Sequence, residues 1–172
     1  YIKEDHILTS YNPQTLSDEF EYPPGDEAFR TYPEVKSELN EYGKNFSKIA
    51  EVIEVGQTIN GRPIMGLHVT GVKKRKKDSF IPGILFVGSH HAREHLSTEV
   101  PMNLIKHLLE SYGKDQRITQ LINSRDLYFI PMLNSDGSLH DIKGRKYKYW
   151  RKNRVNNQDG SFGVDLNRNF GY

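Results

Sequence analysis

The spacing of hydrophobic and polar residues predicts a chain in which strands and helices alternate. Apolar residues alternate with polar ones over residues 49–55. A turn at 57–61 then leads into a second strand-like run at 63–69, an arrangement typical of a β-hairpin. Residues 84–87 and 127–133 are apolar without alternation. This pattern predicts two central strands of a sheet, buried on both faces.

Three further segments have the pattern of helices. Residues 33–42 begin with proline, which suits the first turn of a helix, and are followed by Gly43, which suits the position past its end. Apolar residues at helical spacing predict a longer helix that ends before Gly113, and residues 116–123 predict a short one. We therefore expect an α/β fold with a mixed, mostly parallel central sheet flanked by helices.

Proline leaves two possible starts for the longer helix. Pro101 lacks an amide hydrogen and fits best in the first turn of a helix. The regular helix therefore starts near Ser97, or it starts at Glu94 and is distorted at the proline.

Composition narrows the class of protein. The chain has 172 residues and no cysteine, which excludes disulfides and thiolate metal sites. Its net charge of +2 is too small to predict a polyanionic partner, and no apolar stretch approaches the length of a membrane span. Residues 1–31 are polar and predict an irregular N-terminal extension to a domain at 32–172. The basic run at 73–77 is interpreted as a solvated loop.

A segment rich in histidine follows the first central strand. Residues 88–95 read GSHHAREH, and ligands of open α/β sheets bind beyond the carboxyl ends of strands. Imidazole and carboxylate both bind zinc, and a catalytic zinc has three protein ligands and one open position. His91 and Glu94 are thus candidates for two ligands. An isolated His-x-x-Glu pair, however, more often lies in a solvated loop.

Three more motifs change this assessment. Residues 91–94 (HARE) are followed in order by residues 134–137 (NSDG), 150–154 (WRKNR) and 164–170 (VDLNRNF). With these motifs, the chain from about Tyr32 onward resembles zinc metallocarboxypeptidases of the carboxypeptidase A/B type. The resemblance implies the α/β fold of that family and a long helix that starts at the glutamate of the HARE motif.

The resemblance also implies the metal and the chemistry. His91 and Glu94 become ligands of one zinc ion (Zn2+), and His90 and His95 are less suited because only His91 precedes a glutamate by three residues in this motif. Arg151 becomes the cation that polarises the scissile carbonyl, because a guanidinium stabilises the charge that develops on its oxygen.

Three residues are implied to bind the substrate. Arg93 is the first, and Asn167 with Arg168 binds the terminal carboxylate, since the planar fork of arginine matches a carboxylate in bidentate geometry. The sequence departs from the family pattern at Ser135, where we expect proline. The family's third zinc ligand, general-base glutamate and substrate-capping tyrosine follow the Asn-Arg pair, so we expect them in a missing C-terminal segment of the same domain. The chain is therefore expected to be truncated.

The function implied is that of a zinc-dependent exopeptidase, secreted or extracellular, which hydrolyses the C-terminal peptide bond of peptides or proteins. We expect neither nucleic acid nor membrane as a partner. One alternative is an amidohydrolytic relative that acts on peptidoglycan peptides, and another is a non-catalytic relative. A third is a basic binding module, because residues 143–154 contain seven basic residues, no acid and three aromatic rings.

Overall fold

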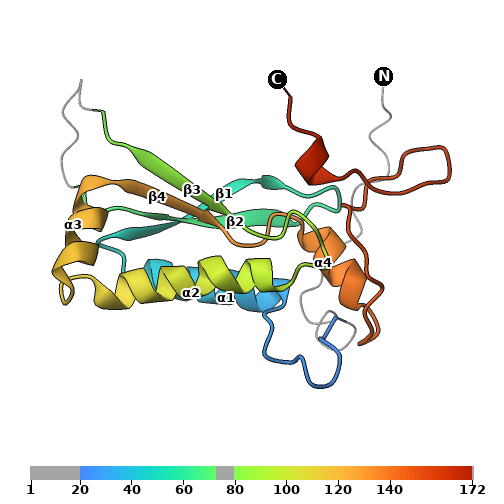
Figure 1. Cartoon of the computed structure of the whole chain (residues 1–172), viewed down its shortest axis with the longest axis horizontal. Coiled ribbons are helices and arrows are strands. Elements are labelled where there is room, and N and C mark those ends of the chain that lie inside the picture. The colour runs from blue at the N-terminus through green and yellow to red at the C-terminus, as the bar shows by residue number, and fades with distance from the viewer. Residues whose placement is uncertain (1–19, 73–79, 172) are drawn as a thin grey trace.

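The computed structural model describes residues 20–72 and 80–171, which include a four-stranded sheet. Its strands follow the spatial order β1-β2-β4-β3 and comprise β1 (Ala50–Gln57), β2 (Pro63–Val69), β3 (Gly83–Val87) and β4 (Asp126–Ile130) (Figure 1). The mixed sheet is confirmed. The expected parallel majority is not found among these strands, because only β3 and β4 pair in parallel. The short turn after β1 makes the β1–β2 pair antiparallel.

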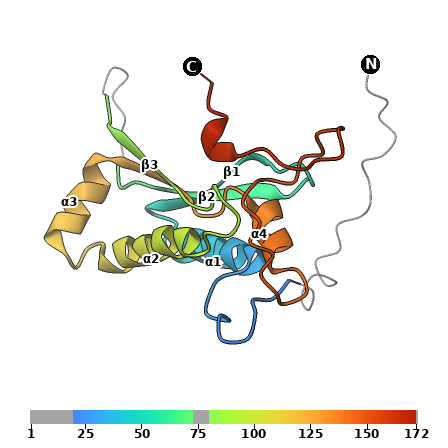
Figure 2. The same ribbon diagram turned by 45° about the vertical axis from the view of Figure 1, so that its right-hand side comes forward.

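The helices are gathered on one face and at the two ends of the sheet. They are α1 (Tyr32–Asn45), α2 (Leu96–Ser111), α3 (Gln116–Ser124), α4 (Ser135–Ile142) and the short 3-10 helix η2 (Leu166–Arg168). In Figures 1 and 2, α1 and α2 lie against the same face, α3 lies at one end of the sheet, and α4 lies beyond the carboxyl ends of β3 and β4. None of the helices in the described ranges is long and apolar enough to cross a membrane.

An apolar core fills the space between the sheet and the helices α1 and α2. Leu67 and Phe129 of the sheet are completely buried there, as are Leu39 of α1 and Ile105 of α2. Phe86 of β3 stacks on Phe129 with ring centroids 4.8 Å apart. The alternation of side chains along β2 and β4 thus directs every second residue into this core.

The predicted end of α1 is wrong, and the structure decides between the two starts predicted for α2. The helix α1 continues through Gly43 to Asn45, because this glycine permits a close approach: a Cβ atom there would lie 2.6 Å from Cγ2 of Val52 in β1. The helix α2 starts at Leu96, which agrees with the predicted start near Ser97 and not with the start at Glu94 that the resemblance implies. Before it, the amide of Ser97 donates to the carbonyl oxygen of Glu94 at 3.0 Å, and this i to i−3 bond closes a turn tighter than an α-helix. Pro101 consequently lies in the second turn of α2.

The two strands predicted to be central differ from each other. The strand β4 is internal and ends at Ile130, before Pro131, which has no amide hydrogen to donate. The predicted central position of residues 84–87 is wrong, because β3 is an edge strand among the residues described. Ile84 is 42% exposed and Leu85 59% exposed.

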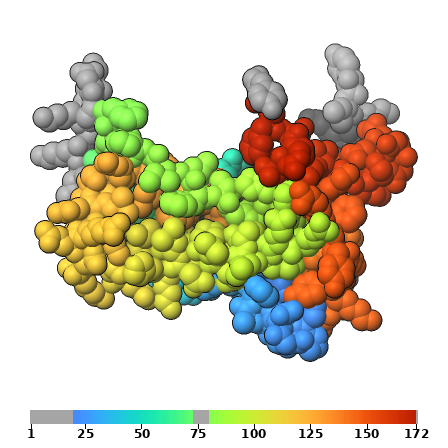
Figure 3. Space-filling model, in the orientation of Figure 1, coloured from blue at the N-terminus to red at the C-terminus, as the bar shows by residue number. Residues whose placement is uncertain are grey.

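The part of the chain after α4 has little regular structure. Its only helix is the short 3-10 helix η2 among the residues described, and Figure 3 shows this C-terminal part, in orange and red, projecting from one end of the molecule. The basic run at 73–77 lies outside the described residues.

Candidate metal and substrate site

The site is built where β3 and β4 end. The amide of Gly88 donates to the carbonyl of Ile130 at 2.9 Å, and the amide of Asn134 donates to the carbonyl of Ser89 at 3.0 Å, so the segments that follow the two strands are held together. Glycine at position 88 permits this contact, because a Cβ atom there would lie 2.4 Å from the carbonyl oxygen of Pro131, directly after β4. The two loops are thereby fixed in the crevice predicted for them.

The NSDG motif fixes the second loop. Asn134 caps α4 by accepting from the amide of Gly137 at 3.2 Å, and its Nδ2 donates to the carbonyls of His90 (3.2 Å) and Lys152 (3.1 Å). Asp136 accepts from the amide of Asn60 at 3.0 Å and pairs with the guanidinium of Arg62. Gly137 leaves room for the Lys152 carbonyl, which a Cβ atom would approach to 2.7 Å. Ser135, at the expected proline, begins α4 and preserves this turn.

The two candidate ligands converge. Nδ1 of His91 lies 3.0 Å from Oε1 of Glu94. The imidazole is buried, at 6% residue exposure, whereas the Glu94 side chain is 51% exposed. One end of the pair is therefore held by the fold and the other is accessible from solvent.

Arg151 joins the same pair, although it lies far away in the sequence. Its Nη1 is 3.3 Å from Oε1 of Glu94, and its Nε donates to Oδ2 of Asp165 at 3.0 Å. The other oxygen of Asp165, Oδ1, lies 3.0 Å from Nε2 of His91. Asp165 thus bridges His91 and Arg151. The VDLNRNF motif contains Asp165, but no role was predicted for this residue. Its position two residues before Asn167 was the available signal.

The carboxylate of Asp165 is held in its charged form. Burial raises its pKa, but the hydrogen bonds from Arg151 and His91 outweigh burial and lower the pKa to about 2. A permanently ionised acceptor at Nε2 favours the imidazole tautomer with a proton on Nε2, which leaves the lone pair on Nδ1 facing Glu94.

This arrangement fits part of a zinc site. Imidazole nitrogen and carboxylate oxygen are ordinary zinc ligands, and metal-bound histidines commonly donate their other ring N–H to a carboxylate, as Asp165 permits here. No group of three or more His, Cys, Asp or Glu residues in 20–72 and 80–171 is arranged to hold a metal ion. The described residues therefore offer two converging candidate ligands and a carboxylate that contacts one of them.

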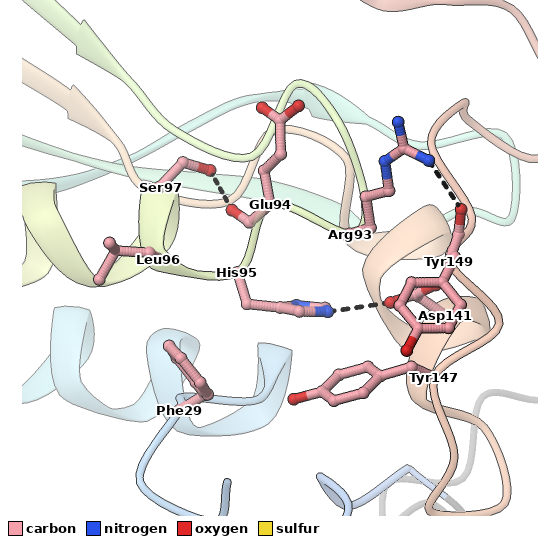
Figure 4. A pocket seen from close by; sticks show the side chains of 9 residues that line it. All are labelled: Phe29, Arg93, Glu94, His95, Leu96, Ser97, Asp141, Tyr147 and Tyr149. Carbon is pink, nitrogen blue, oxygen red and sulfur yellow. Dashed lines mark hydrogen bonds and ion pairs between the residues drawn. The ribbon is translucent and has the colours of Figure 1, made fainter.

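The predicted substrate-binding residues are less closely grouped. Arg93 donates to the carbonyl of Tyr149 at 3.4 Å and lines a pocket of about 440 Å³ beside Glu94 (Figure 4). Asn167 and Arg168 lie in η2 and are exposed, and Arg168 donates to the carbonyl of Asn167 at 2.9 Å. Asp165 ties this helix to the site, because its Oδ1 also accepts from the amide of Asn167 at 3.0 Å.

The fold and the paired side chains define a class of protein, an α/β protein with two candidate metal ligands at the carboxyl ends of β3 and β4. The zinc carboxypeptidase family model matches residues 35–172. The chain belongs to the zinc carboxypeptidase family, whose characterised relatives are metallocarboxypeptidase hydrolases.

Individual relatives agree with this assignment. The chain is 33% identical over 88% of its length to a zinc carboxypeptidase of Saccharothrix mutabilis subsp. capreolus, covering 34% of that protein. It is 32% identical over 84% of its length to metallocarboxypeptidase A of Trichophyton tonsurans, covering 33% of it. The chain thus spans about a third of the length of the curated relatives it matches.

Solved structures show the same fold. Carboxypeptidase A from Helicoverpa armigera superposes with a TM-score of 0.71 at 31% identity, over 83% of this chain and 34% of that one. Thrombin activatable fibrinolysis inhibitor superposes with a TM-score of 0.73 at 27% identity, over 83% of this chain and 34% of that one. The expected α/β fold with a mixed sheet flanked by helices is therefore confirmed.

Proposed function

We propose that the protein is a zinc-dependent carboxypeptidase that removes the C-terminal residue of peptides or proteins. One observation carries the proposal: Nδ1 of His91 and Nη1 of Arg151 both face the same oxygen of Glu94, at 3.0 and 3.3 Å. Two ligand atoms and a permanent cation are thus within reach of one point, as hydrolysis of a peptide bond at a metal requires.

His91 and Glu94 would hold the ion, which when bound activates water and polarises the scissile carbonyl. Arg151 supplies positive charge to the oxygen of that carbonyl as negative charge develops on it. Asp165 orients both His91 and Arg151. We further propose that the third ligand and the general base come from a C-terminal segment of the same domain, and that the protein is secreted or extracellular, as the family resemblance implies.

The substrate's chain end is proposed to be read by Arg93, Asn167 and Arg168. The guanidinium of Arg168 is exposed, and among residues 20–72 and 80–171 it donates only to the carbonyl of the neighbouring Asn167. It can therefore turn to meet a carboxylate. This pair favours a carboxypeptidase over the alternative, an amidohydrolytic enzyme of peptidoglycan, because a free terminal carboxylate is what two such donors bind.

The contacts of the basic segment favour the enzyme over a nucleic-acid-binding module. Arg145 pairs with Glu21 at 3.2 Å, Arg151 pairs with Glu94 and Asp165, and Arg154 lies over the rings of Trp150 and Phe162. A surface that binds phosphates needs cations that are free to contact them, whereas these cations hold the segment in place.

The test uses N-blocked dipeptides with a free or an amidated C terminus and the complete protein in which this chain occurs. We expect hydrolysis of the free acid only, lost on chelation and restored by zinc. Arg168→Ala should weaken binding of the free-acid peptide by about 10- to 100-fold, because a charge-assisted contact contributes about 1.5–3 kcal/mol. Arg168→Lys should restore only part of this affinity.

Arg125→Ala is the matched control. Like Arg168, Arg125 donates to the carbonyl of the preceding residue, Ser124, at 2.8 Å, but it lies directly before β4, at the opposite end of that strand from the site. This variant should hydrolyse the dipeptide at the parent rate. Equal hydrolysis of acid and amide would show that no carboxylate is read, and activity that survives chelation would show that zinc is not used.

A further inference from the structure

A buried hydrogen-bonded chain runs behind the metal-binding loop. Nδ1 of His95 lies 2.9 Å from the hydroxyl of Tyr22, and Nε2 of His95 lies 2.9 Å from Oδ2 of Asp141. Tyr22 is 3% exposed, His95 9% and Asp141 0%. Figure 4 shows the His95 ring directed at Asp141 while the neighbouring Glu94 side chain points elsewhere. A buried carboxylate is costly unless it is hydrogen-bonded, so each of its contacts matters.

Asp141 connects the two segments that carry the site. Through Oδ2 it meets His95, the residue directly after Glu94. Through Oδ1 it accepts the amide of Trp150, the residue directly before Arg151, at 2.5 Å. The carboxylate of Asp141 therefore holds His95, next to the proposed metal ligand Glu94, and Trp150, next to the proposed catalytic cation Arg151.

A backbone bond reinforces this connection. The amide of Ala92 donates to the carbonyl of Arg151 at 3.0 Å. The metal-binding loop and the Arg151 segment are thus joined twice, by this bond and through Asp141. On the far side, Tyr22 belongs to the N-terminal extension, and burial raises its pKa, which keeps the hydroxyl protonated. Arg30 of the same extension pairs with Glu99 of α2. The extension is thus tied to the loop and to the helix that follows it.

We propose that Asp141, acting through His95, is a positioning residue that sets the placement of Glu94 relative to Arg151. The inference rests on the proposed function, since it assigns Glu94 to the metal and Arg151 to the substrate carbonyl. Misplacing such groups by about 1 Å is enough to lower a rate about 100-fold, and loss of a group that orients a metal ligand typically costs about 10- to 100-fold in metal affinity or activity.

A matched pair of a histidine and a buried carboxylate lies away from the site. Nε2 of His68 lies 2.9 Å from Oδ1 of Asp126, and this carboxylate is buried at 4% exposure. The pair joins β2 to β4 near the start of β4, at the opposite end of that strand from the metal-binding loop. Asp126→Ala therefore removes a buried partner of histidine without touching either segment of the site.

The experiment compares Asp141→Ala, Asp141→Asn and Asp126→Ala in the complete protein, with zinc affinity measured by competition with a chelator and with kcat and KM measured separately. Asp141→Ala should lower zinc affinity about tenfold and kcat about 10- to 100-fold. KM should stay within about twofold of the parent value because the substrate contacts remain. Asp141→Asn should recover most of both, because its amide oxygen can still accept from Trp150. Asp126→Ala should lower thermal stability while zinc affinity and kcat stay at the parent values.

His95→Phe provides a second route if Asp141→Ala does not fold, because phenylalanine keeps a ring and lacks both nitrogens; it too should weaken zinc about tenfold. Parent-like zinc affinity in a folded Asp141→Ala or His95→Phe variant would overturn the inference, and so would an equal loss in Asp126→Ala. If the parent binds zinc but releases no C-terminal residue, the proposed function fails while zinc affinity still decides the positioning role.

Discussion

The apolar core under the sheet and the polar region at the strand ends are both buried, but they are built differently. In the core, Leu39, Leu67 and Phe129 exclude water and make no directional contacts. At the strand ends the buried residues are polar, and Asn134 and Asp141 each bind two segments that are distant in sequence. Burial in the first region stabilises the fold, whereas burial in the second fixes geometry.

This difference teaches where error is tolerated. Apolar contacts are non-directional, so the core accepts other side chains of similar volume, while a buried polar group that loses its partner costs about 1–3 kcal/mol. Two buried polar atoms without a partner occur among the described residues, Nε of Arg62 and Oγ of Ser135. Both atoms lie in the polar region, beside Asp136. The hydrogen-bonding groups of the polar region are therefore not all satisfied.

The largest expected effect is on the core. Phe129→Ala should lower the free energy of unfolding by about 3–5 kcal/mol, because it removes a completely buried ring and leaves a cavity next to Phe86. Chemical denaturation followed by circular dichroism measures this loss. Zinc affinity of the fraction that remains folded should not change.

Leu85→Ala is the control for this prediction. Leu85 lies on the neighbouring strand β3 and is 59% exposed, so its truncation should change the free energy of unfolding by only about 0.5 kcal/mol. A loss as large as that of Phe129→Ala would mean that the outer face of β3 is also packed, and the contrast between core and edge would disappear.

The second effect should combine stability and geometry. Asn134→Ala removes the N-cap of α4 and two hydrogen bonds to the loops of His90 and Lys152, at a cost of about 2 kcal/mol. Because the His90 carbonyl precedes His91, zinc should also bind more weakly, as competition with a chelator measures.

Asp115→Ala separates these two consequences. Asp115 caps α3 by accepting from the amide of Ile118 at 2.9 Å, and α3 lies at the end of the sheet opposite the carboxyl ends of β3 and β4 (Figure 1). Its loss should cost about 1 kcal/mol and leave zinc affinity at the parent value. The assignment of a geometric role to Asn134 would be wrong if both variants bound zinc equally well.

The sequence predicted the core better than its borders. The hairpin, the buried β4 strand and the helix at 116–123 were predictable because each has an apolar period that tertiary contacts reinforce. The helix α4 was missed because its buried residues are mostly polar, among them Ser135, Asp136 and Asp141. The edge position of β3 was not predictable either, since Ile84 and Leu85 are as apolar as residues that are buried on both faces.

The polar region was predictable only as far as its motifs reach. His91, Glu94 and Arg151 were proposed together from motifs, and the structure brings them together. The hydrogen bonds from Tyr22 through His95 to Asp141 join three segments that share no motif, so no spacing along the sequence indicates them. Such a contact depends on side-chain directions after three elements have packed, which a periodic pattern does not contain.

The smallest expected effect concerns His140, at the border of the polar region. Its ring meets that of Trp150 edge-on, with ring centroids 5.2 Å apart. Burial, together with the nearby cations Arg154 and Lys148, lowers the pKa of His140 from 6.5 to about 4. Asp141 opposes this shift, and Lys143 adds to it. The folded protein therefore keeps this imidazole neutral under conditions in which the unfolded chain takes up a proton.

Stability should accordingly fall as the pH is lowered from about 6.5 to about 4, because the unfolded state binds more protons than the folded state in that window. Above the window the contribution of His140 is fully present, and below it no further loss arises from this residue. His140→Gln should reduce the difference in unfolding free energy between pH 7 and pH 5, whereas His107→Gln, which removes an exposed histidine of α2, should leave it as in the parent. An unchanged difference in His140→Gln would show that this ring is not held neutral by its surroundings.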